Sequence, residues 1–239
     1  MRKFTILFLF LALVFPGIVI GQKVKPAFDL TSKSMRFPHQ YKKWRFQTSV
    51  GFSMVKPPFD LVENAIQAPL VNFHTTFGMP LGFSLEGDIT TLVVSNQLCL
   101  GPRWNFIYKN FSFNLGYDLG FQVGWMTFGG FNNTGTGWVH YPNASIGFKT
   151  RDVAFTLKGE VMILGQIMLK AGENEVDRKN DYFNGGTLAL YLEQRLWKDK
   201  VLTIGLKDNY VKLYWPCWFL FTTFDRYYHV PELYFSWVL

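Results

Sequence analysis

The stretch FSFNLGYDLGFQVGW, residues 111–125, alternates apolar or aromatic residues with small or polar ones without a break. Because successive side chains of a β-strand point to opposite faces, this strand has one apolar face and one polar face. A water-soluble sheet buries its apolar face against a second layer, whereas a transmembrane barrel turns that face towards lipid and keeps the polar face for its lumen. The small and polar residues of this stretch favour the barrel.

Ten successive segments between Lys42 and Leu239 show the same alternation. They predict strands at 42–56, 66–79, 81–95, 97–108, 111–128, 137–150, 152–165, 185–197, 200–214 and 224–239. Tight turns lie at one end of these strands, and longer connections at 57–65, 129–136, 166–184 and 215–223 lie at the other, where Ser95-Asn96 is a short exception. We therefore predict an all-β fold, a transmembrane antiparallel up-and-down β-barrel of about ten strands. Eight strands are the alternative, if the ninth segment is not a strand or if two neighbours merge.

Three details of the strand pattern predict β-bulges. Pro102 and Pro142 fall inside predicted strands, where each removes a ladder donor. In the ninth strand the apolar phase changes, from Leu202, Ile204 and Leu206 to Val211 and Leu213. A bulge in that strand would restore a single apolar face.

The sequence divides into three parts. Residues 1–21 resemble a secretory signal peptide, with Arg2 and Lys3 before a long apolar run. An uncleaved anchor helix is the alternative, since the run approaches the roughly 20 residues that span a bilayer. Residues 22–41 form a basic periplasmic tail that is disordered, enters the lumen or binds another envelope protein, and residues 42–239 form the barrel. Cys99 and Cys217 are too few for a disulfide scaffold, so we expect two free thiols or one pair.

Aromatic residues are predicted at both ends of the strands. Trp44, Trp104 and Trp237 belong to the group at the tight-turn end. The group at the opposite end consists of Trp125, Trp138, Trp215, Tyr227 and Tyr228. Because aromatic rings favour membrane interfaces, two girdles of this kind are typical of a spanning barrel.

At its C-terminus the chain alternates Leu233, Phe235, Trp237 and Leu239. Together with the strand pattern, this ending resembles small bacterial outer-membrane β-barrel proteins, which present such a strand to the barrel assembly machinery. Their last residue is usually aromatic, and Leu239 departs from that. The resemblance implies integral residence in the outer membrane of a Gram-negative bacterium, with outer-membrane lipid and lipopolysaccharide as partners. The net charge of +7 gives no nucleic-acid signal, since a secreted barrel meets none.

Strand parity predicts a charged lumen with six acidic and six basic side chains. They are Arg45, Glu86, Asp88, Arg103, Asp118, Lys149, Lys158, Glu160, Glu193, Arg195, Lys207 and Glu232. In a narrow barrel these charges should pair, because an unpaired ion away from bulk water costs several kcal/mol. Such a network favours a filled, stabilising lumen, to which His74 would belong. An ion-selective pore would show an excess of one sign at a constriction, which this count lacks.

Catalytic and metal sites find little support in the sequence. His140, Ser145 and Glu160 offer an acid–base and nucleophile set by residue type, but parity sends His140 towards lipid and the other two inward. No His or Cys cluster has the spacing of a metal site. We therefore predict no catalytic residues, no metal and no cofactor.

The connection at 215–223 is unusually apolar for a loop. Its candidate surface consists of Trp215, Cys217, Trp218, Phe219 and Phe221. These residues either dock a protein partner in the outer membrane, extend the lipid-facing belt or cap the lumen. By contrast, the charged residues 170–181 predict a solvated loop. The leading function is a non-enzymatic structural or accessory subunit of an outer-membrane complex, followed by a narrow channel for small solutes and then by a lipid- or peptide-modifying enzyme.

Overall fold

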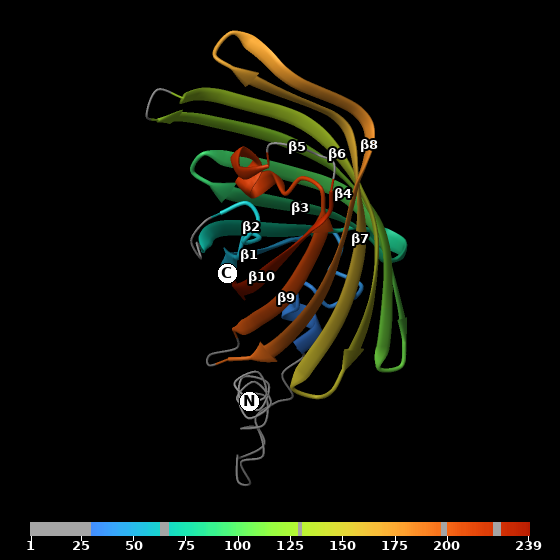
Figure 1. The fold of residues 1–239 in the computed structure, drawn as a ribbon. Helices are drawn as coiled ribbons and strands as arrows, with labels where there is room; N and C mark the ends of the chain where they lie inside the picture. Colours follow the sequence, from blue (N-terminus) through green and yellow to red (C-terminus); the bar gives the residue numbers. More distant parts are fainter. Residues whose placement is uncertain (1–29, 63–66, 129–130, 197–199, 222–225) are drawn as a thin grey trace, which may run out of the picture.

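The computed structural model describes residues 30–62, 67–128, 131–196, 200–221 and 226–239, and in them the chain forms a closed antiparallel barrel (Figure 1). The strands are β1 (Phe46–Val55), β2 (Ala68–Gly78), β3 (Phe83–Leu92), β4 (Ser95–Tyr108), β5 (Phe111–Phe128), β6 (Phe131–Lys149), β7 (Val153–Ala171), β8 (Asn174–Arg195), β9 (Val201–Val211) and β10 (Tyr228–Val238). Each pairs with its sequence neighbours, and β1 pairs with β10 to close the cylinder. The prediction of ten strands is confirmed, and the alternative of eight is wrong. The predicted signal peptide and residues 22–29 lie outside the described residues.

The alternation in the sequence becomes an inside and an outside. Along β5, Phe113, Leu115 and Leu119 are exposed on the exterior, while the neighbouring Ser112 and Asn114 are buried in the interior. A water-soluble monomer rarely exposes so large an apolar surface, whereas a bilayer accommodates it. The exterior is therefore that of a transmembrane barrel. Among the described residues, no helix is long and apolar enough to cross a membrane.

The strands β5 to β8 continue well beyond the others. Residues 131–136 and 166–184, predicted as connections, are largely strand, and β7 joins β8 through a turn at Gly172 and Glu173. The 22 residues of β8 are twice the roughly 9 to 11 that cross a bilayer, so two hairpins project past the rim (Figure 1). We call this end of the barrel the hairpin end, and the end with the turns Lys109-Asn110 and Arg151-Asp152 the turn end. The loop predictions were wrong because polar residues hide the alternation in these projecting segments.

The three predicted bulges are absent. At Pro102 the ladder between β4 and β5 lacks two successive pairs but keeps its register, and the same holds at Pro142 between β6 and β7. Strand β9 keeps one register with both of its neighbours. The apparent phase change has another cause: Val211 and Leu213 are apolar residues that are buried in the interior at the hairpin end. The register shifts that do occur lie between Trp138 and Val139 in the β6–β7 ladder and at two places between β7 and β8.

Two segments outside the strands fill the ends of the cylinder. The 3-10 helix η1 (Leu30–Lys33) and residues 34–41 lie inside the turn end, where Leu30, Met35 and Phe37 pack against Ala154, Val201 and Val238. The 3-10 helix η4 (Trp215–Leu220) lies within the hairpin end, in an apolar cluster with residues of β6, β7 and β9. These two apolar clusters lie at opposite ends, and a small third cluster of Ala189, Tyr191 and Tyr234 lies among the polar residues of the interior.

Candidate functional site

Residues 34–41, which we call the plug, are held inside the barrel by one carboxylate. Glu193 of β8 is fully buried and accepts three backbone N–H groups, from Met35 at 2.7 Å, Arg36 at 3.1 Å and Phe37 at 2.6 Å. The hydroxyl of Ser112 donates to the carbonyl of Pro38. Three charge-assisted bonds on one buried carboxylate fix the backbone of the plug firmly. Of the alternatives for the tail, the structure therefore shows entry into the lumen by residues 34–41.

Arg36 carries the plug into the middle of the lumen. Its guanidinium donates to Asp88 at 3.0 Å and to the hydroxyl of Tyr234 at 3.1 Å, and it lies over the rings of Tyr191 and Tyr234 at 5.4 and 5.2 Å. His74 adds a 2.9 Å contact to the same carboxylate, as a member of the lumen network. Arginine suits this position because its charge stays on while its plane stacks on aromatic faces.

The strand walls add further ion pairs. Arg103 of β4 contacts Glu86 at 3.3 Å and Asp118 at 2.5 Å. Lys158 pairs with Glu160 at 2.9 Å, and Lys207 pairs with Glu232 at 2.8 Å.

The remaining predicted bases lie away from these pairs. Arg45 is exposed ahead of β1, and Lys149 and Arg195 are the last residues of β6 and β8, at the turn end. Once these three rim residues are set aside, the described strands turn six carboxylates but only three basic side chains into the lumen. The predicted equality of acidic and basic side chains therefore does not hold in the interior. Arg36 of the plug supplies a fourth base. Buried carboxylates without partners are costly, which gives a reason for the plug to be drawn in.

Residues 214–221, which we call the cap, close the hairpin end. Trp215, Cys217, Trp218 and Phe221 are buried, and Phe219 is half-buried. The hydroxyl of Ser95 donates to the carbonyl of Pro216 at 2.8 Å, and the indole of Trp215 donates to the carbonyl of Asn96 at 3.1 Å. The candidate partner surface of the sequence is therefore turned into its own barrel. The expected place of Trp215 and Tyr228 on an outer aromatic rim is wrong, because both side chains are buried inside.

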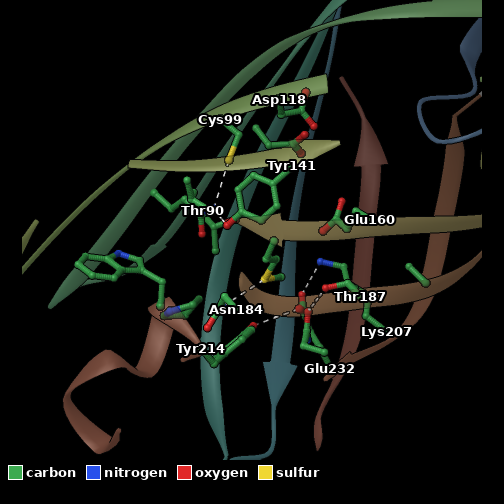
Figure 2. Close-up of a pocket in the computed structure, with 18 of the residues that line it drawn as sticks. Thr90, Cys99, Asp118, Tyr141, Glu160, Asn184, Thr187, Lys207, Tyr214 and Glu232 are labelled. Carbon is green, nitrogen blue, oxygen red and sulfur yellow. Dashed lines mark hydrogen bonds and ion pairs between the residues drawn. The ribbon is translucent and has the colours of Figure 1, made fainter. Parts of the chain in front are cut away.

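A polar chamber of about 120 Å³ lies between plug and cap (Figure 2). Arg36 borders it from the plug, and Trp215 and Pro216 border it from the cap. Between them the wall combines charged, amide and hydroxyl side chains, including Asp118, Glu160, Asn184, Thr187, Lys207 and Glu232, with apolar ones such as Val139 and Leu164. Cys99 also borders the chamber, and both cysteines are free thiols. The plug and the cap border the chamber on opposite sides.

The structure does not assemble the conceivable catalytic set. His140 lies on the exterior, where its Nδ1 forms a 2.6 Å hydrogen bond with the hydroxyl of Tyr117. Glu160 points into the chamber, opposite to His140. Within the described part of the chain, no group of three His, Cys, Asp or Glu side chains is placed to hold a metal ion.

Sequence reasoning missed four residues of this site. Tyr191, Tyr234 and Tyr214 surround the charges of the chamber, and Arg36 was assigned only to a basic tail. The inward parity of Tyr191 and Tyr234 was a usable signal, since each shares a face with a predicted lumen carboxylate. Arg36 had no such signal, because no periodicity extends into residues 30–41.

No protein-family model and no curated protein matches this sequence. Among solved structures, Neisserial surface protein A is 12% identical, over 81% of this chain and 96% of that chain, with a TM-score of 0.36. The translocator domain of the autotransporter NalP from Neisseria meningitidis is 8% identical, over 81% and 86%, with a TM-score of 0.40. Outer membrane phospholipase A from Escherichia coli is 7% identical, over 91% and 98%, with a TM-score of 0.37. These scores carry no argument about function.

The chain has the architecture of a small outer-membrane β-barrel protein. That statement rests on its own closed strand order and on its exposed apolar exterior.

Proposed function

We propose that this protein is a non-enzymatic barrel of the Gram-negative outer membrane that serves as a structural or accessory subunit of an outer-membrane protein complex. One observation carries the proposal: the chain itself occupies both ends of its lumen, through the plug and the cap. Because the interior is taken up in this way, the surfaces left for function are the lipid-facing wall and the projecting hairpins. Outer-membrane lipid and lipopolysaccharide would cover the wall. A cleaved signal peptide and aromatic girdles, with Trp44 at one end and Trp125 at the other, belong to the same proposal.

The projecting part of β8 offers the best surface for a protein partner. Strand β9 ends at Val211, opposite Gly185, so residues 174–183 of β8 pair with β7 on one side and with no described strand on the other. Val176 and Phe183 are exposed there, at 67% and 54%. An unpaired strand edge with exposed apolar side chains can accept an added strand from another protein. The cap no longer supports docking, because its apolar side chains are buried in its own barrel.

Co-purification from native membranes in mild detergent, followed by mass spectrometry, tests this proposal. We expect a stable companion that is lost in the double variant Val176→Lys and Phe183→Lys. The matched control is Phe59→Lys, which charges an exposed aromatic residue in the β1–β2 connection at the same end. Recovery of the monomer alone from native membranes would overturn the proposal.

A narrow channel for small solutes is the second candidate. The polar chamber and the carboxylate-rich wall favour it, since both resemble the lining of a solute path. Planar-bilayer recordings on folded protein separate the two candidates. The closed barrel predicts no steady conductance from the unmodified chain, whereas a constitutive channel predicts one.

A further inference from the structure

The plug and the cap are connected by side chains that cross the chamber. At the cap, the hydroxyl of Tyr214 donates to Glu232 of β10 at 3.1 Å. Glu232 also accepts from Lys207 of β9 at 2.8 Å, and the ammonium of Lys207 lies 5.1 Å from the centre of the Tyr234 ring. The hydroxyl of Tyr234 accepts from Arg36 of the plug at 3.1 Å. One continuous series of contacts therefore runs from one closure to the other.

Most groups of this series are buried. Glu232, Tyr234 and Tyr214 are between 1% and 5% exposed, and the side chains of Arg36 and Lys207 are 9% and 19% exposed. In such a medium, removing one partner leaves a buried charge or hydroxyl without compensation, which is strongly unfavourable. Withdrawal of Arg36 would take the donor from Tyr234 and the guanidinium from Asp88. The Tyr234 ring would then lose the hydrogen bond that anchors it, and Lys207, which lies against that ring and holds Glu232, would shift with it.

We propose that the plug and the cap form one gate of the lumen whose two closures open together, coupled through Tyr234, Lys207 and Glu232. Each closure stabilises the arrangement of charges that the other needs. The inference goes beyond the proposed function, since it concerns the barrel by itself and holds with or without a partner protein.

Cys217 provides a native reporter for the cap. Its thiol is buried at 2% exposure, so a maleimide reaches it only when the cap opens. The full chain in detergent is labelled, and peptide mass mapping separates Cys217 from Cys99. Trypsin cleavage at the Arg36–Phe37 bond reports on the plug in the same samples, because that bond is accessible only when the plug leaves the lumen.

Two variants open one closure each. Glu193→Gln loosens the plug without touching the cap, and it is expected to raise labelling of Cys217 at least tenfold. Gly124→Val acts on the cap alone, since a Cβ at this position falls 2.3 Å from the indole nitrogen of Trp218, and it is expected to raise cleavage after Arg36. Coupling between two sites is reciprocal, so both directions must show it. Asp152→Asn, which changes an exposed carboxylate in the turn between β6 and β7, is the control and should alter neither rate.

The connecting residues are tested in the same assay. Lys207→Met should abolish the effect of Glu193→Gln on Cys217 while leaving its effect on cleavage after Arg36. Should Glu193→Gln fail to fold, Phe37→Asp releases the plug from within the plug itself. The proposal is overturned if plug release, seen as faster cleavage, leaves labelling of Cys217 unchanged.

Discussion

The carboxylate of Glu193 should decide whether the plug stays in the lumen. In Glu193→Gln, one amide oxygen can still accept from Met35 and Arg36, but the amide nitrogen then faces the N–H of Phe37. One charge-assisted bond is lost and two become neutral, at about 1 to 3 kcal/mol for each change. A neutral side chain is cheaper to bury, which offsets part of the loss. We expect the docked plug to be destabilised by about 3 kcal/mol, or on the order of 100-fold in its population ratio.

Limited trypsinolysis of detergent-solubilised protein measures this effect. Cleavage after Arg36 tracks the released population when release is faster than cutting. Asp152→Asn is the control, because it neutralises an exposed carboxylate in the turn between β6 and β7, outside the plug contacts. Equal rates of cleavage after Arg36 in Glu193→Gln, Asp152→Asn and the unmodified chain would refute the role of Glu193.

Four further predictions concern the cap, the lumen and the exterior. Burial raises the pKa of the Cys217 thiol to about 12, so the reactive thiolate stays scarce in the closed state, and maleimide labelling of native protein should be slower than that of unfolded protein from pH 7 to pH 9; equal rates in the two states would contradict this. Gly124→Ala should destabilise the protein by about 1 to 3 kcal/mol in a thermal melt, because its Cβ meets Trp218, whereas Gly159→Ala, with nothing within 4 Å, should melt like the unmodified chain. In planar bilayers, the double variant Arg36→Gln and Glu193→Gln should show intermittent currents whose reversal potential indicates cation preference. The reason is that the lumen wall still carries five carboxylates against three basic side chains. Anion preference would contradict this charge assignment. Without detergent the protein should aggregate, as light scattering would show, and a folded monomer in plain buffer would remove the transmembrane assignment.

The alternation of apolar and polar residues alone was sufficient to predict the strands and their number. The pattern of residues 111–125 becomes β5, and its apolar face is the exterior. The same signal fails where a barrel uses apolar residues on its inside. Val211, Leu213 and Trp215 were assigned to a phase change and to an outer rim, but they pack together within the hairpin end. Apolar composition alone cannot distinguish a residue that faces lipid from one that faces an apolar cap, whereas the unbroken parity of β9 sends Val211 inward.

Strand parity gives the direction in which a side chain points, but not its position along the barrel axis. Parity gave Arg45, Lys149 and Arg195 the same direction as Lys158 and Lys207, and so predicted equal numbers of charges. In the structure these three residues lie ahead of or at the ends of strands, at the rim of the turn end. The charge of the interior depends on this separation and on Arg36, which comes from a segment without periodicity.

The seam of the barrel has a consequence for biogenesis. Residues Ser49–Val55 of β1 pair with Glu232–Val238 of β10, so the cylinder closes only when these two strands meet. Strand β10 also carries Glu232 and Tyr234, which receive the hydroxyl of Tyr214 and the guanidinium of Arg36. Assembly of the seam and anchoring of both closures therefore depend on the same strand.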